Sequence, residues 1–311
     1  MRGDFLAIVQ TNLAVTSEIC AEIIQKLEKS YPFLEAEVLT TTAFGRPLYV
    51  IRMGEGDRHV IFTAAHHANE WITTPLLLKF AEELAESYKK DGTLYGVPAK
   101  NILKYSTIHL VPMVDPDGVD LVTGAIRPQT PEYNIARQIA GDFPDIPFPD
   151  GWKANLLGVD LNLQYPAGWL QAREIKFSQG YTRPGPRDYV GRAPLNQFET
   201  QGLAGYTEEI DPDLVLAYHS QGKEIYWQFR DYFVPGAREL GEVMARVSGY
   251  ALADTPYESS FAGYKDWFIQ NFRRPGYTVE VGSGENPLPL SQFPEIYRDN
   301  VPLLNIAALG V

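Results

Sequence analysis

Apolar residues recur along the chain at intervals that predict several helices. In residues 17–29 one face carries apolar side chains at the spacing of an amphipathic helix, namely Ile19, Ile23, Ile24 and Leu27. The stretches 73–90 and 236–250 are also predicted to be helical, and a last helix is expected from about Ser291. Pro75 is compatible with the helix at 73–90, because it would lie in the first turn, where a missing N–H breaks no intrahelical hydrogen bond.

Continuous apolar and β-branched runs predict buried strands. They lie at 47–53, 59–65, 106–114, 213–220, 224–229 and 277–281. The Gly-Glu-Gly-Asp between the first two is typical of a hairpin turn, and the run at 106–114 ends in a turn with the sequence Asp-Pro-Asp-Gly. Strands that are apolar throughout and alternate with helices indicate a mixed, mainly parallel sheet with helices on both faces. We therefore predict an α/β fold.

The periodic pattern disappears between about residues 121 and 205. This stretch is rich in glycine, proline, asparagine and aromatic residues. So long an irregular region in a compact protein is usually functional. We expect a single catalytic domain over residues 1–311, with this stretch as a long irregular excursion that carries specificity.

The composition limits the possible partners. With 27 Lys and Arg against 39 Asp and Glu, the formal net charge is −12, which argues against a nucleic-acid partner because such a partner requires a basic face. No stretch approaches the roughly 20 apolar residues of a membrane span. The start of the chain lacks the features of a signal peptide. The expected location is the cytoplasm for the chain as given, or the cell wall if an N-terminal segment has been removed.

Three of the five histidines follow or end strand-like runs, namely His66, His67 and His219. In open α/β sheets, ligands bind in the crevice beyond the carboxyl ends of the strands. Two histidines and a glutamate, with a fourth position open, form a catalytic zinc site, and Glu70 lies close to the first pair. Cys20 is the only cysteine, so any metal must be held by histidine and carboxylate. The spacing leaves open whether His66 or His67 faces the metal.

Glu280 is a candidate general base. It lies near the end of a buried strand, between Val279 and Val281, where an isolated carboxylate is costly to bury. A zinc hydrolase needs such a group to accept a proton from water. The alternative is an edge-strand glutamate that faces solvent. His59 and His109 lie within strand runs and are expected to be ordinary packed histidines.

Five motifs occur in an order that resembles the zinc carboxypeptidase family from about residue 35 to the C-terminus: HHANEW, DPDGVDL, GVDLN, AYHSQG and YTVEVG. The resemblance implies one zinc ion per chain, held by His67, Glu70 and His219, with Glu280 as the general base. Lys153 stands where the family has an arginine after a tryptophan, so it would polarise the scissile carbonyl. The alternative for Lys153 is a surface lysine in a polar loop.

Two departures from the family pattern affect the expected substrate. Asn162 is kept, but Leu163 stands where the family has the arginine that binds a free terminal carboxylate. Lys265 occupies the position at the floor of the specificity pocket, where a cation suits an acidic substrate group. Tyr257 lies one residue out of register with the family's mobile tyrosine and is a further candidate for substrate binding.

These departures resemble one bacterial branch, the γ-D-glutamyl-meso-diaminopimelate or γ-D-glutamyl-L-diamino acid peptidases. The resemblance implies hydrolysis of that bond in a peptidoglycan stem peptide or muropeptide by metal-activated water. One alternative is a zinc carboxypeptidase for ordinary peptides with an acidic C-terminal residue. Another is a non-catalytic, cell-wall-binding relative. The presence of His67, Glu70, His219 and Glu280 weakens the second alternative, and Leu163 weakens the first.

Overall fold

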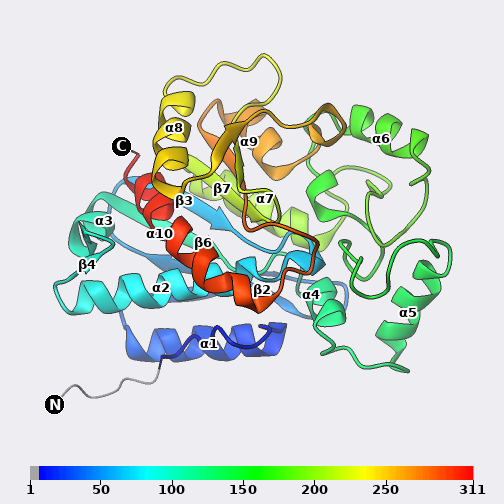
Figure 1. Cartoon of the computed structure of the whole chain (residues 1–311), viewed down its shortest axis with the longest axis horizontal. Helices are drawn as coiled ribbons and strands as arrows, with labels where there is room; N and C mark the ends of the chain where they lie inside the picture. Colours follow the sequence, from blue (N-terminus) through cyan, green and yellow to red (C-terminus); the bar gives the residue numbers. More distant parts are fainter. Residues whose placement is uncertain (1–6, 311) are drawn as a thin grey trace.

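A central eight-stranded sheet runs through the computed structural model, which describes residues 7–310 (Figure 1). Its strands are β1 (Glu35–Thr41), β2 (Pro47–Met53), β3 (Arg58–Thr63), β6 (Ser106–Val111), β7 (Leu214–His219), β8 (Glu224–Tyr226), β9 (Ala251–Ala253) and β10 (Gly276–Glu280). Their spatial order is β1-β2-β6-β3-β7-β10-β8-β9. The short strands β4 (Thr93–Leu94) and β5 (Val97–Pro98) form a separate antiparallel pair.

The pairing confirms a mixed sheet. The pairs β3–β6, β3–β7, β7–β10 and β8–β9 are parallel. The pairs β1–β2, β2–β6 and β8–β10 are antiparallel. The four central strands β6, β3, β7 and β10 all run in one direction, so their carboxyl ends lie at one edge of the sheet.

Helices cover both faces of the sheet, as the uninterrupted apolar strands predict. One face packs against α1 (Ser17–Ser30), α2 (Thr73–Lys89), α3 (Ala99–Tyr105), α8 (Ala237–Ser248) and α10 (Phe293–Leu309). The other face packs against α7 (Phe198–Ile210) and α9 (Tyr264–Phe272). Strand β3 shows the alternation, because Val60 and Phe62 point into the first core and Ile61 points into the second. Within the described residues, no helix is long and apolar enough to cross a membrane.

The predicted hairpin between residues 47–53 and 59–65 is wrong, because β6 lies between β2 and β3. The glycines of the connecting turn serve a different purpose. A Cβ on Gly54 would lie 2.1 Å from the carbonyl oxygen of Ser106, and one on Gly56 would lie 2.0 Å from the carbonyl carbon of Tyr105. These glycines let the turn pass directly against the start of β6, which a side chain would prevent.

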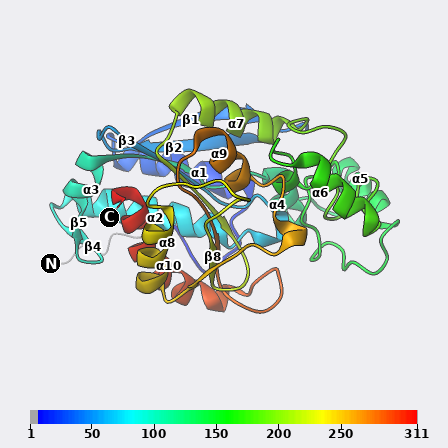
Figure 2. The ribbon, with the colours of Figure 1, turned by 90° about the horizontal axis from the view of Figure 1, so that it is seen from above.

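The region 121–205 contains more helix than its sequence pattern predicts. It includes the end of α4 (Pro116–Val122), α5 (Pro131–Ala140), α6 (Trp169–Ser178) and the start of α7. The predicted Asp-Pro-Asp-Gly turn is the start of α4, where the Asp115 side chain accepts a hydrogen bond of 2.9 Å from Gly118 N. Helices α5 and α6 lie beyond one end of the sheet in both views (Figures 1 and 2).

Candidate active site

The candidate chemical residues meet at the carboxyl ends of the central parallel strands. Strand β3 leads into the turn that carries His66 and His67 and the short helix η1 (Ala68–Glu70). His219 is the last residue of β7, and Glu280 is the last residue of β10. The two are register partners, so both side chains leave the sheet at the same level. This is the crevice in which open α/β sheets bind ligands.

Hydrogen bonds fix the turn after β3. The Thr73 hydroxyl accepts from Ala65 N at 2.9 Å and donates to Glu70 O at 2.8 Å, which ties the start of α2 to both sides of the turn. The backbone N–H of Ala68 donates to Lys153 O at 3.0 Å, so the turn also contacts the irregular region. The side chains of the turn are therefore presented from a rigid backbone.

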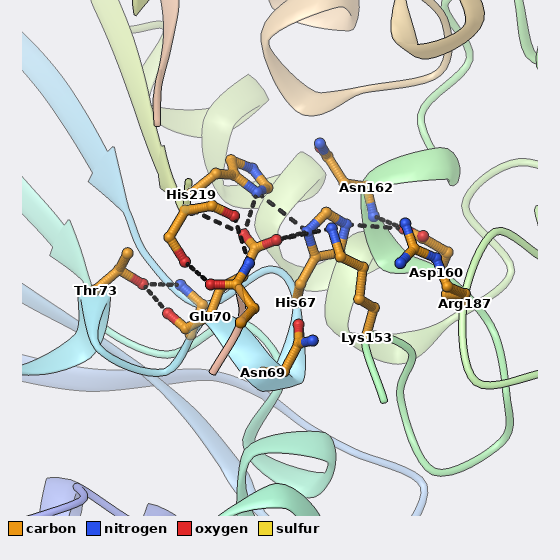
Figure 3. A network of polar contacts seen from close by, with 12 residues as sticks. His67, Asn69, Glu70, Thr73, Lys153, Asp160, Asn162, Arg187 and His219 are labelled. Atoms are coloured by element: carbon orange, nitrogen blue, oxygen red, sulfur yellow. Dashed lines mark hydrogen bonds and ion pairs between the residues drawn. The ribbon is translucent and has the colours of Figure 1, made fainter. Parts of the chain in front are cut away.

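Three of these side chains form a metal-compatible cluster (Figure 3). His67 Nδ1 lies 3.0 Å from Glu70 Oε1, His219 Nδ1 lies 2.9 Å from Glu70 Oε2, and the two Nδ1 atoms are 3.2 Å apart. All three potential ligand atoms lie within 4.8 Å of one another. Two imidazole nitrogens and a carboxylate facing one point are the donor set of a catalytic zinc site, so the residues fit this metal.

The structure distinguishes the two adjacent histidines. His67 belongs to the cluster, whereas His66 points elsewhere and places its Nε2 3.2 Å from the Tyr165 hydroxyl. His59 and His109 lie within the sheet, as expected, with His59 Nδ1 3.0 Å from His109 Nε2. None of these three histidines is part of the cluster.

Asp160 is a functional residue that the sequence analysis did not single out. Its Oδ1 lies 3.1 Å from His67 Nε2, the ring nitrogen that faces away from the cluster. Burial would raise the pKa of this carboxyl, but His67 and Lys153 hold it below its usual range. A carboxylate behind a ligand histidine fixes the ring orientation and tautomer. Its position within the GVDLN motif was the available signal.

Lys153 is not a surface lysine. Its Nζ lies 2.9 Å from Glu70 Oε1, and its side chain is only 19% exposed. Burial alone would lower the pKa of Lys153, but the charge of Glu70 raises it. The same pairing acts on Glu70, whose pKa burial would raise but which His67 and Lys153 hold well below its usual range. A permanent cation therefore lies directly beside the metal-compatible cluster.

Glu280 lies at the pocket surface near the cluster but is not part of it. No hydrogen bond or ion pair joins its carboxylate to another residue among those the structure describes. Burial and the negative charge of Glu70 raise the pKa of Glu280 to about 8. A carboxyl with a pKa near neutrality can accept a proton and later return it.

The cluster opens into a cavity of about 800 Å³. Asn162 and Lys265 both line it, and their role in substrate binding stays a prediction. Lys265 is 4% exposed, and its Nζ lies 2.5 Å from Asp266 Oδ1 and 2.7 Å from Gln228 O. The cavity therefore contains a paired cation and anion at this point, not an isolated lysine.

Tyr257 is not brought into the cavity. It lies in η3 (Tyr257–Ser259), is 66% exposed, and packs against Phe261 with ring centroids 5.3 Å apart. The role of Tyr257 in substrate binding therefore stays a prediction. Its exposed loop places it outside the group of lining residues.

Arg187 lines the same cavity and was also missed from the sequence. In Figure 3 it lies on the side of His67 that faces away from His219. No local motif surrounds it, and it comes from the excursion rather than from a strand end. Only the tertiary fold brings it to the site.

An α/β sheet with this donor set at its strand ends defines a zinc-dependent hydrolase. Comparison with known proteins narrows the class. The family model described as zinc carboxypeptidase matches residues 20–303, and the chain belongs to the zinc carboxypeptidase family. The chain is accordingly a zinc-dependent peptidase, as its motifs predict.

The relatives agree with this assignment. The γ-D-glutamyl-L-diamino acid endopeptidase 1 of Lysinibacillus sphaericus is 42% identical over 278 residues, which cover 89% of this chain and 67% of that protein. Among solved structures, carboxypeptidase A from Helicoverpa armigera has a TM-score of 0.74 at 17% identity and covers 97% of this chain and 75% of its own. The murein-tripeptide amidase from Escherichia coli O157 has a TM-score of 0.56 at 21% identity, with coverage of 87% and 91%. The two structural likenesses concern the fold.

Proposed function

We propose that this peptidase hydrolyses the amide between the γ-carboxyl of D-glutamate and the L-centre of a diamino acid such as meso-diaminopimelate, in peptidoglycan stem peptides. The observation that carries the proposal is the 42% identity, over 89% of this chain, to a relative named for that linkage. The charged lining of the cavity supports it, because both residues of the substrate bear free ionic groups.

The residues at the strand ends suit amide hydrolysis. His67, Glu70 and His219 would hold one zinc ion, which supplies a Lewis acid that polarises a carbonyl and lowers the pKa of water. Glu280 accepts the proton of the attacking water and delivers it to the departing amine nitrogen. Lys153 stabilises the negative charge that develops on the scissile carbonyl oxygen, as a point charge without the fork of an arginine.

The pair formed by Lys265 and Asp266 suits the far end of diaminopimelate. That end carries both a carboxylate and an ammonium group. Lys265 uses two of its three N–H donors on Asp266 and on the Gln228 carbonyl, which leaves one for a substrate carboxylate. Asp266 lines the cavity beside it and offers the matching negative charge to the ammonium.

The test is hydrolysis of L-Ala-γ-D-Glu-meso-diaminopimelate by the zinc-loaded protein, with products identified by mass. The expected products are L-Ala-D-Glu and free diaminopimelate. Glu280→Gln should keep its fold and its zinc and lose on the order of 10²-fold or more in kcat. Glu242→Gln is the matched control, because Glu242 pairs with Arg238 on the surface of α8, outside the cavity, and it should stay close to wild type. Normal turnover by Glu280→Gln would require another base.

The second candidate is a carboxypeptidase for ordinary peptides that end in an acidic residue. Lys265 in the cavity favours it, because its cation suits a side-chain carboxylate as well as diaminopimelate. A competition between the muropeptide and peptides ending in Glu, Lys or Phe separates the two candidates. Faster hydrolysis of the Glu peptide would establish the second.

A further inference from the structure

Position 163 cannot supply a cation to the cavity. Leu163 lies in η2 (Leu161–Leu163), is 8% exposed, and packs into the second core of the protein with Tyr165 and Ala167. The neighbouring Asn162 does line the cavity. A substrate carboxylate beside Asn162 would therefore need a cation from another part of the chain.

Arg187 is held in place to provide one. Hydrogen bonds join residues 186–189 to residues 153–160, with lengths of 2.7 Å (Lys153 N to Pro186 O), 2.9 Å (Ala154 N to Pro186 O), 2.9 Å (Asp160 N to Tyr189 O) and 3.2 Å (Asp188 N to Asp160 Oδ2). The segment that carries Arg187 is thereby fixed to the segment that carries Lys153 and Asp160. Its guanidinium enters the cavity from a constrained backbone, not from a free loop.

Arg187 shares its carboxylate partner with a second cation. Its Nε donates to Asp188 Oδ2 at 2.6 Å, but the other oxygen of that carboxylate is 2.6 Å from Lys176 Nζ. Two cations thus share one anion. Lys153, the other cation on this side of the cavity, is paired with Glu70. Arg187 therefore has no carboxylate to itself, because Asp160, the other anion whose charge acts on it, is bonded to His67.

The guanidinium also has donors to spare. Its Nη atoms make no hydrogen bond to any of residues 7–310, and its side chain is 40% exposed at the cavity. A guanidinium with both terminal nitrogens open presents a fork that matches the two oxygens of a carboxylate. The nearby carboxylates, on Asp188, Asp160 and Glu70, all have other cationic or hydrogen-bonding partners.

We propose that Arg187 binds a carboxylate of the substrate. Two carboxylates flank the bond that the proposed function assigns as scissile, namely the α-carboxylate of D-glutamate and the carboxylate at the L-centre of diaminopimelate. The assignment of these two groups rests on the proposed function. The Arg187 guanidinium can bind either of these two carboxylates through the same paired hydrogen bonds.

The test compares wild type with Arg187→Gln on three substrates, using the zinc-loaded full chain. They are L-Ala-γ-D-Glu-meso-diaminopimelate, its D-isoglutamine analogue, and its amide at the L-centre carboxylate. On the parent substrate, Arg187→Gln should raise KM by roughly 10- to 100-fold with little change in kcat, because a charged partner is lost in a part-exposed site. Arg187→Lys should recover part of the loss, since it keeps the charge but not the fork.

The two amides identify the carboxylate. For the wild-type enzyme, KM should be higher by a similar factor on one of the two amides than on the parent substrate. On that amide, Arg187→Gln should raise KM no further, because the carboxylate that Arg187 binds is already absent. Arg183→Gln is the matched control, because Arg183 pairs with Asp142 outside the cavity, and it should match wild type throughout. Equal losses for Arg187→Gln on all three substrates, or a loss of bound zinc, would overturn the proposal in favour of a structural role.

Failure of the proposed function gives a different result. Wild type would then leave all three muropeptides intact and cleave ordinary peptides. In that case the same comparison is made with a peptide ending in Glu and with its C-terminal amide. Dependence on Arg187 for the free acid alone would support carboxylate binding, and equal dependence for both would refute it.

Discussion

Asp160→Asn should weaken zinc binding without unfolding the protein. Asp160 contacts no cluster atom that faces the metal, and acts through His67 Nε2 at 3.1 Å. Its other hydrogen bonds, from Asn162 N and Asp188 N, go to side-chain oxygens. An asparagine can keep the oxygen shared by His67 and Asn162 N but loses the bond from Asp188 N, so the substitution removes the negative charge behind the ligand ring and one bond to a neighbouring segment.

The expected size follows from that change. A hydrogen bond to a charged partner contributes about 1.5–3 kcal/mol and a neutral one about 0.5–1.5 kcal/mol. The difference, about 1–1.5 kcal/mol, corresponds to roughly a five- to tenfold weaker affinity. If the substitution also shifts the His67 ring, the zinc affinity should fall further, by up to about 100-fold, as when other residues that support a metal ligand are replaced.

The pH of the assay matters. Burial lowers the pKa of His67, but Glu70 and Asp160 raise it to about 9, so zinc must displace a proton at neutral pH. Removing Asp160 makes that proton easier to displace, which opposes the loss of affinity. Competition with a chelator at pH 9, where about half of the His67 side chains have already lost the proton, reduces this compensation to about a factor of two. Asp213→Asn, which alters a carboxylate bonded to His59 N outside the cluster, is the control. Unchanged zinc affinity at pH 9 in folded Asp160→Asn protein would refute the role assigned to Asp160.

Two further predictions concern stability. Burial raises the pKa of Glu199 to about 7 from 4.5, so between these values the folded state keeps a proton that the unfolded state has lost, and stability falls as the pH rises through this window. Glu199→Gln should remove up to roughly 3 kcal/mol of that fall in the free energy of unfolding. The measurement is the difference in the free energy of urea unfolding between pH 5 and pH 8. The same pH dependence in the variant and in wild type would contradict the prediction. Lys265→Met should leave the buried Asp266 unpaired and cost about 3–5 kcal/mol. The double variant Lys265→Met/Asp266→Asn should regain most of this in the same assay, and a double variant as unstable as the single would show that the loss has another origin.

The strands that the sequence predicts most directly are those buried on both faces. Strand β3 and strand β7 read as uninterrupted apolar runs because helices cover both of their faces. Strand β1 was missed, since it lies at the sheet edge and its residues are mostly exposed. The mistaken hairpin has the same origin. Local turn residues indicate that the chain turns, but they do not reveal that β6, some 50 residues later in the sequence, inserts between β2 and β3.

The residues of the candidate site also differ in how far the sequence could predict them. His66, His67, Glu70, His219 and Glu280 could be singled out because each follows or ends a strand, where local pattern and position coincide. Pattern and position did not distinguish His67 from His66, and the choice of His67 came from the resemblance to the family. Asp160 and Arg187 could not be assigned by pattern alone. Their roles depend on contacts with residues far away in sequence, and neither lies on a strand. The burial of Lys153 and Lys265 likewise depends on partners that only the folded chain brings near.

The backbone hydrogen bonds that join residues 186–189 to residues 153–160 have a consequence for how this enzyme could diversify. The metal-facing side chains are carried mainly by strand ends, while Lys153 and Arg187 are carried by two segments of the excursion that are bonded to each other. Side chains on such a segment can change while the backbone bonds remain. Substrate preference can therefore vary in evolution or in the laboratory while the sheet that holds the metal site stays intact.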